Sequence, residues 1–192
     1  MNVIEAIRTR RTIRHYLPDD VSEDNLKAVL EAAHWAPSWA NTQCTKFVVV
    51  RDIEIKAKLA ASLRPGNPAT EAMNQAPIII VLCAELGKSG YTGGGNVTNR
   101  DSWKVSITAK GDWYMFDTAL AMQNLALAAH ALGLGTVIVG GFNPWEVAEI
   151  LNIPRGVEVV VMTPLGYPVK SAKQPSRLPL SEIVFRDSYG KE

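Results

Sequence analysis

A run of apolar residues, Ile78-Ile79-Ile80-Val81-Leu82-Cys83, lies near the middle of this 192-residue chain. A strand that is covered on both faces reads as an unbroken apolar run, whereas a half-exposed strand alternates apolar and polar residues. The run therefore predicts a strand inside a central sheet that is covered on both sides. β-branched and aromatic residues predict further strands at 45–50, 136–139 and 157–162.

Helix start and stop signals separate these strands. Asn2 and Ser22 are the expected N-caps of the first two helices, and the second helix should stop before Pro37. Asn143 followed by Pro144 is typical of an N-cap and first helical residue, and predicts a short helix after the third strand.

The longest helix is predicted at 113–132, where apolar residues occur on almost every side and Gly133 ends the pattern. Such a helix belongs in the centre of a core or in a subunit interface. A shorter helix is expected at 52–63. Strands separated by helices, without an internal repeat or a linker, indicate one α/β or α+β domain over 1–192.

Composition excludes several classes of partner. The formal net charge is +1, with 47% hydrophobic and 20% charged residues, so no basic excess points to a nucleic acid. Cys44 and Cys83 lie in or beside apolar runs without a C-x-x-C pair, as expected for buried, reduced thiols. Neither a secretion signal nor an apolar run of about 20 residues is visible, so we expect a cytoplasmic location.

The usual catalytic signatures are missing. His15, His34 and His130 lack the spacing of metal ligands, and no nucleophile elbow or phosphate-binding P-loop stands out. The sequence predicts neither hydrolysis nor metal chemistry, and it offers no conspicuous acid–base residue.

Three arginines fall within the five residues Arg10-Arg11-Thr12-Ile13-Arg14. Guanidinium groups this close repel one another unless an anion gathers them, and they bind phosphate through paired, charge-assisted hydrogen bonds. The segment therefore predicts a phosphate site. A solvated basic end of the first helix stays an alternative, above all for Arg8.

The segment Ala36-Pro37-Ser38-Trp39-Ala40-Asn41-Thr42-Gln43 follows the second predicted helix. Its amides and hydroxyls can donate to and accept from the edge of a heterocycle whose carbonyl and N–H groups alternate. Read alone, the segment also fits an ordinary loop that ends a helix.

In this order and spacing, the two segments resemble the R-R-[ST]-x-R and A-P-S-x-x-N-x-Q motifs of the nitroreductase family. The long predicted helix, whose last part and following turn are residues 125–135, is similar to the long central dimer helix of that family. Residues 136–142 are similar to the family's flavin-facing turn. Gly166-Tyr167-Pro168 and Arg177-Leu178-Pro179-Leu180 resemble its closing pattern. The likeness covers nearly the whole chain.

The resemblance implies a nitroreductase-like α+β fold: a mixed, mainly antiparallel sheet flanked by helices, with an extended C-terminal tail on a partner subunit. It implies a homodimer that binds FMN at its subunit interface and takes electrons from NADH or NADPH, with a nitroaromatic, a quinone or a similar small molecule as acceptor in ping-pong turnover. No catalytic side chain is implied, because the flavin carries the chemistry. The implied cofactor-binding residues are Arg10, Arg11, Thr12, Arg14, Pro37, Ser38, Trp39, Asn41, Gln43, Val139, Gly140, Gly141 and Arg177.

Several positions depart from the family pattern or stay open. Gly140 replaces a glutamate of some members, and Pro175 replaces a late basic residue for which Lys173 is a nearby substitute. Asp117 aligns with a helix position that faces the flavin in some members. The glycine-rich stretch 86–112 is a candidate lid or acceptor-side wall. Its aromatic residues are Tyr91, Trp103 and Trp113.

Three other functions remain open at this point. One is a specialised branch of the same family, such as a dehalogenase, an enone reductase or a flavin-destroying enzyme. The second is a flavin-binding protein without catalysis. The third is a small-anion binding domain without flavin. The sequence does not choose between NADH and NADPH, because it has no recognisable ribose-reading acidic residue.

Overall fold

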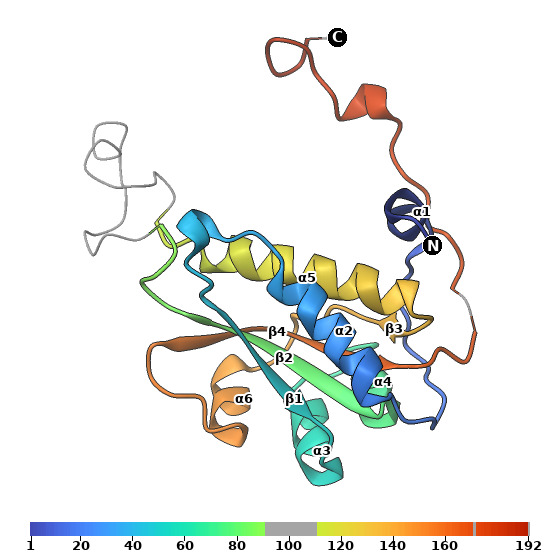
Figure 1. The fold of residues 1–192 in the computed structure, drawn as a ribbon, viewed down its shortest axis with the longest axis vertical. Helices are drawn as coiled ribbons and strands as arrows, with labels where there is room; N and C mark the ends of the chain where they lie inside the picture. The colour runs from blue at the N-terminus through green and yellow to red at the C-terminus, as the bar shows by residue number, and fades with distance from the viewer. Residues whose placement is uncertain (91–110, 171, 192) are drawn as a thin grey trace.

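A four-stranded sheet forms the centre of the computed structural model, which describes residues 1–90, 111–170 and 172–191 (Figure 1). Its strands, in the spatial order β1-β2-β4-β3, pair antiparallel throughout. They are β1 (Thr45–Val50), β2 (Ile78–Glu85), β3 (Gly135–Thr136) and β4 (Val157–Gly166). A parallel bridge joins Thr12 to Thr136 at the β3 edge, so the mixed, mainly antiparallel sheet is confirmed.

The central strand β2 is buried on both faces, as the apolar run predicts. Ile78, Ile80 and Leu82 pack into one core cluster, whereas Ile79, Val81 and Cys83 pack into the other. This division follows from the alternation of side chains along a strand. The two core clusters therefore lie on opposite faces of β2, which is the central strand of the fold.

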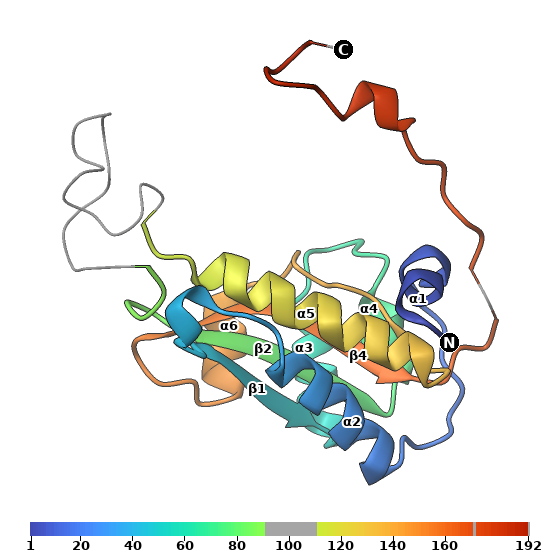
Figure 2. The ribbon, with the colours of Figure 1, turned by 45° about the horizontal axis from the view of Figure 1, so that its top comes forward.

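Two layers of helices cover the sheet (Figures 1 and 2). The helices α2 (Glu23–His34) and α5 (Tyr114–Ala131) lie together on one face. The helices α3 (Ile53–Ala61), α4 (Thr70–Gln75) and α6 (Pro144–Ile150) cover the other. The first helix, α1 (Val3–Thr9), lies beside the C-terminal end of α5. None of the helices in the described ranges is long and apolar enough to cross a membrane.

The predicted helix caps are confirmed. The Asn2 side chain accepts a hydrogen bond from the Glu5 backbone N–H at 2.9 Å, and Ser22 caps α2 in the same way. The Asn143 side chain caps α6, with Pro144 as the first residue of the helix. Gly133 follows α5 at a φ of +77°, a conformation that glycine adopts without strain.

One predicted strand is too long, and one helix was not predicted. The strand predicted at 136–139 shortens to Gly135–Thr136, because residues 137 and 138 form no ladder with β4 and the chain rejoins it only through the Val139–Met162 bridge. Helix α4 was not predicted. It is six residues long, and its N-cap residue, Ala69, has no side chain that could cap it, so neither length nor a start signal marks it.

Much apolar surface stays exposed. On α5 it includes Met115, Phe116 and, at the end of the helix, Leu132. Residues 172–191 form a tail that runs past α1 and away from the sheet (Figure 2). The tail exposes Leu178, Leu180, Ile183 and Val184.

Candidate functional site

The loop at 37–43 has an unusual backbone. Ala40, Asn41 and Gln43 all have positive φ values, of 46°, 56° and 51°. Residues with a side chain rarely adopt this left-handed region, and each instance costs about 1 kcal/mol or more. Internal hydrogen bonds accompany the strained shape, since the Gln43 backbone N–H donates to Ser38 Oγ at 2.9 Å and the Asn41 N–H donates to the Ser38 carbonyl at 3.0 Å.

The loop presents its polar groups to the surface. Pro37, Asn41 and Gln43 are exposed, and Ser38 and Trp39 are half-buried. The amides of Asn41 and Gln43 are therefore available to a ligand from outside this subunit, as the heterocycle-binding hypothesis requires. The hydroxyl of Thr42 is buried and has no hydrogen-bond partner among the described residues.

A buried carboxylate holds the base of this loop. Asp117, in the first turns of α5, is 2% exposed and accepts a bifurcated hydrogen bond from the Trp39 backbone N–H at 3.1 and 3.2 Å. It also accepts from Ser89 Oγ at 2.6 Å, and the Cys44 thiol lies 3.6 Å away. Asp117 thus points into the protein. No sequence pattern indicates this network, because its members lie on three separate segments.

Both cysteines are buried free thiols, as the sequence predicts. Burial raises the pKa of Cys44 to about 11, with a further contribution from the Asp117 charge, and burial also raises the pKa of Cys83 to about 11. Thiols with such pKa values are poor nucleophiles at neutral pH. No group of His, Cys, Asp and Glu side chains in the described ranges is arranged to hold a metal.

The arginine segment lies at the other end of α5. After α1 the chain extends along β3, where the Ile13 backbone N–H donates to the Thr136 carbonyl at 2.9 Å. The close approach requires Gly135, since a Cβ there would lie 2.7 Å from the Ile13 side chain. This contact fixes the segment that carries Arg10, Arg11 and Thr12.

The guanidinium groups of this segment have no carboxylate partner among the described residues. Arg11 donates to the backbone carbonyls of Arg8 and Arg10, at 2.8 and 2.7 Å. No ion pair within the described parts of the chain involves Arg8, Arg10, Arg11 or Arg14. A positive segment without a carboxylate partner retains its full capacity for an anion.

A hollow of about 180 Å³ adjoins the same segment, with Thr12, Arg14, His15 and Lys170 among its lining residues. Lys170 was not predicted from the sequence, because it lies between the two closing motifs and belongs to neither. Two cationic side chains and a hydroxyl in one hollow of this size suit an anionic group of a ligand.

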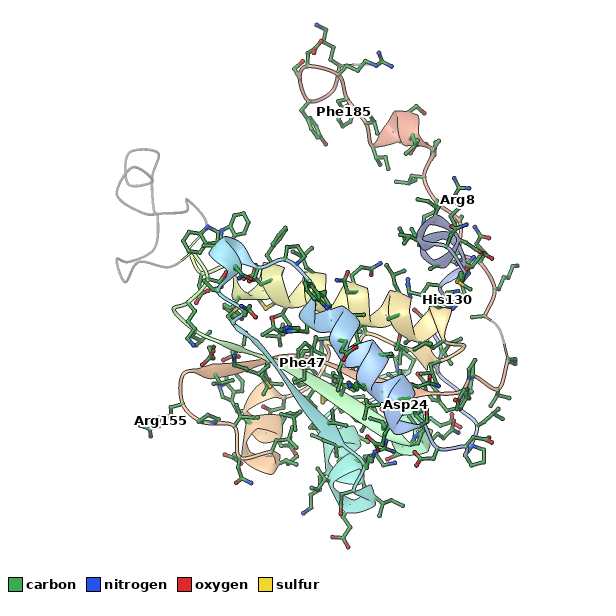
Figure 3. The ribbon with its side chains drawn as sticks, in the orientation of Figure 1. Arg8, Asp24, Phe47, His130, Arg155 and Phe185 are labelled. Carbon is green, nitrogen blue, oxygen red and sulfur yellow. The ribbon has the colours of Figure 1, made fainter. Side chains whose placement is uncertain are left out.

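A histidine ties the arginine segment to α5. His130 Nε2 lies 2.8 Å from Thr9 Oγ1, next to α1 (Figure 3). The Thr9 hydroxyl donates to the Glu5 carbonyl, so the proton in the pair with His130 belongs to Nε2. Burial, then the charges of Arg10 and Arg11, lower the pKa of His130. The neutral imidazole is therefore the form that the fold favours.

The turn at 139–141 completes the predicted site residues. Val139 is buried and paired with Met162, whereas Gly140 is exposed. The Gly141 carbonyl accepts from the Arg64 backbone N–H at 3.0 Å and from Asn67 Nδ2 at 3.1 Å. Sequence reasoning missed Arg64 and Asn67, which belong to a loop of the opposite helical layer and carry no motif of their own.

The structure does not bring all the predicted residues together. The loop at 37–43 is bound to Asp117 and the arginine segment to His130, and 13 residues of α5 separate the two, a distance of about 20 Å. Arg177 and Lys173 are exposed on the tail, which leaves the body of this subunit (Figure 3). Tyr91 and Trp103 lie outside the described residues.

Comparisons with known proteins agree with this architecture. The family model described as Nitroreductase family matches residues 7–167. The NAD(P)H FMN reductase of Bacillus subtilis (strain 168) is 31% identical over 193 residues, which cover 97% of this chain and 74% of that protein. The chain belongs to the nitroreductase family.

Solved structures show the same fold. A nitroreductase family protein from Clostridium novyi NT is 30% identical with a TM-score of 0.74, covering 100% of this chain and 96% of the other. The NADPH:FMN oxidoreductase of Vibrio harveyi, solved with NAD⁺, is 25% identical with a TM-score of 0.78. The match covers 98% of this chain and 78% of the other. The nitroreductase-like fold predicted from the resemblance is confirmed.

Proposed function

We propose that this protein is a homodimeric, FMN-dependent oxidoreductase that passes electrons from NADH or NADPH to a small acceptor such as a nitroaromatic or a quinone, by ping-pong turnover. The names of its relatives support the flavin and the nicotinamide donor. The proposal includes one FMN-binding domain over 1–192 and a cytoplasmic location.

One observation carries the proposal of a shared site. The two segments suited to FMN lie at opposite ends of α5, about 20 Å apart. In FMN the phosphate and the ring are joined by a ribityl chain that is too short to span that length with both ends bound. A second copy related by a two-fold axis places its own 37–43 loop beside the arginine segment of the first. Two equivalent sites result.

The exposed apolar surface supports this dimer. Met115 and Phe116 are exposed on α5, Leu132 is exposed at its C-cap, and Val3 and Ile7 are exposed on the neighbouring α1. A helix that is apolar on all sides is stable in water only when each side is covered. A partner helix running antiparallel to α5 covers this face, and this orientation brings unlike ends of the two helices together.

The tail has a matching docking place on the partner. Strand β1 is the edge of the sheet, and its outer side has no neighbouring strand among the described residues. A groove of about 620 Å³ runs beside it, lined by Leu30, His34 and Phe47 among others, with Phe47 between α2 and the sheet (Figure 3). An apolar, extended segment fits an open strand edge. In our proposal the tail of the partner subunit covers this edge. The same tail brings its Arg177 to the phosphate of a bound FMN.

The residues present fit FMN. Arg10, Arg11 and Lys170 supply positive charge to a dianionic phosphate, and no carboxylate of the described residues forms an ion pair with them. Thr12 supplies a hydroxyl. At the other end, the amides of Asn41 and Gln43 and the hydroxyl of Ser38 match the alternating donors and acceptors of a flavin edge.

Bound FMN supplies the hydride chemistry. The chain itself orients the ring and stabilises charge. Arg14, near the pyrimidine end of the ring in this arrangement, stabilises negative charge on it. The Val139 N–H already donates to the Met162 carbonyl, so in this proposal the N–H groups of Gly140 and Gly141 would face the ring, and Asn67 holds this turn through the Gly141 carbonyl. No side-chain acid or base is required.

The test is the visible absorption spectrum of the purified protein after addition of FMN, followed by anaerobic addition of NADH or NADPH. A bound flavin that bleaches with either nucleotide supports the proposal and identifies the donor. A bound flavin that stays oxidised with both contradicts the proposed activity and favours a binding protein without catalysis. Failure to bind FMN contradicts the cofactor assignment.

A further inference from the structure

Asp117 connects segments that are distant in sequence. Its carboxylate accepts from the Trp39 backbone N–H, at the start of the 37–43 loop, and from the Ser89 hydroxyl at 2.6 Å. Asp117 is 2% exposed and Ser89 is 0% exposed. Among the described residues no cation forms an ion pair with Asp117. The hydrogen bonds to this charge must therefore offset the loss of water around it.

The Ser89 end of the network belongs to a second anchored segment. The Ser89 carbonyl accepts from the Trp113 backbone N–H at 2.6 Å, and the Gly87 N–H donates to Asp112 Oδ2 at 2.7 Å. These bonds attach residues 86–90 to the start of α5. Asp117 thus links this junction to the 37–43 loop.

The loop needs an external anchor. Three of its residues, Ala40, Asn41 and Gln43, have positive φ values, and Ala40 gains no compensating side-chain hydrogen bond. A strained backbone of this kind persists only where the surrounding structure over-determines it. The Trp39 N–H bond to Asp117 comes directly before the strained residues.

A catalytic role for the Ser89–Asp117 pair does not fit the geometry. Both side chains are buried, and a cavity that Asp117 lines, beside Ser38 and Gln43, measures about 30 Å³. That volume accommodates one or two water molecules and no substrate.

We propose that Asp117 is a positioning residue that holds the 37–43 loop in its ligand-ready shape. The inference deepens the proposed function and rests on it where FMN affinity is concerned. The bond from Trp39 to a buried carboxylate is charge-assisted, and the loss of such a bond corresponds to about a tenfold change in an equilibrium constant. Removal of the carboxylate should therefore weaken FMN binding by about tenfold while the phosphate contacts stay in place.

Three variants separate this role from simple stabilisation. D117A removes the hydrogen bonds to Trp39 and Ser89 and the contact with the Cys44 thiol. D117N keeps one acceptor for the Trp39 N–H, the amide oxygen in place of Oδ1, and its amide N–H donates to the Ser89 hydroxyl in place of Oδ2. S89A removes the Ser89 bond alone and is the matched control. If D117A does not fold, D117S replaces it, since the shorter side chain does not reach the Trp39 N–H.

The first measurement is amide hydrogen exchange at residues 38–43 in the protein without FMN, and the second is the dissociation constant of FMN. We expect faster exchange in this loop and about tenfold weaker binding for D117A, with D117N within about threefold of the unmodified protein. S89A should be less stable and yet retain the loop exchange and the FMN affinity.

Equal loop exchange and equal FMN affinity in D117A and S89A would overturn the positioning role and leave the proposed function intact. An unmodified protein that does not bind FMN would refute the proposed function instead. In that case the loop exchange still decides the positioning role, because it involves no flavin.

Discussion

The contact between Gly135 and Ile13 allows one substitution to test both the stability of the fold and the position of the arginine segment. A Cβ at position 135 would lie 2.7 Å from Ile13 Cβ and Cγ1 and 2.9 Å from Ile13 Cγ2. These atoms belong to a buried, β-branched side chain next to the backbone, so they cannot move aside easily. Overpacking of this kind costs about 1–3 kcal/mol of the free energy of unfolding.

The G135A variant should therefore unfold at a lower urea concentration than the unmodified protein. For a chain of this length, a loss of about 2 kcal/mol lowers Tm by roughly 4–8 °C. The Ile13 N–H bond to Thr136 must also shift, so FMN binding should weaken as Arg10 and Arg11 move. Urea denaturation at a fixed protomer concentration, without FMN, isolates the stability effect.

The G140A variant is the matched control for stability. Gly140 has no unusual φ, and a Cβ there would meet no atom within 4 Å. Glycine-to-alanine changes at such compatible sites stabilise by about 0.4–1 kcal/mol through the unfolded chain. If G135A proved as stable as G140A, the tight packing of the arginine segment on β3 would be refuted.

Three further predictions concern the phosphate end and the helix caps. The double variant R10A/R177A should release FMN while it stays a folded dimer. Gel filtration measures the dimer and the flavin spectrum measures the bound FMN. Full flavin retention would contradict the phosphate assignment. Because burial and the charges of Arg10 and Arg11 lower the pKa of His130 below 6.5, the fold favours its neutral form. Stability should then be fully present above pH 6.5 and decrease as the pH falls through the lowered pKa, and urea titrations of H130Q should lack this component. N143A removes the cap of α6 and should lower the free energy of unfolding by about 1 kcal/mol, whereas an unchanged urea midpoint would argue against the cap.

Elements with a local signature were predictable from the sequence. The β2 run, the caps at Asn2, Ser22 and Asn143, and the stop at Gly133 each depend on residues that lie within a few positions of one another. The fold class and the family followed from motifs of the same local kind.

Features that depend on contacts between distant segments were not predictable. The sequence contains Asp117, Ser89 and Trp39 but gives no sign that they meet in a buried network. Nor does it show that Lys170 lines the hollow beside Arg14.

The prediction of a strand at 136–139 was wrong for a related reason. Its residues are suitable for a strand, but strand pairing depends on the position of β4. The chain departs from β4 after Thr136 and returns only at Val139. The strand propensity of single residues does not predict where a chain leaves its neighbouring strand.

The most direct test of the shared site mixes two inactive variants. One chain carries R10A and R11A, and the other carries N41A and Q43A, so each homodimer should bind FMN weakly. A heterodimer of the two contains one site in which both mutated halves meet and one site in which both halves are intact. Our account predicts that FMN titration of the purified heterodimer recovers one tight site per dimer. Recovery of no tight site would contradict it, because a site built within one subunit stays damaged in both chains.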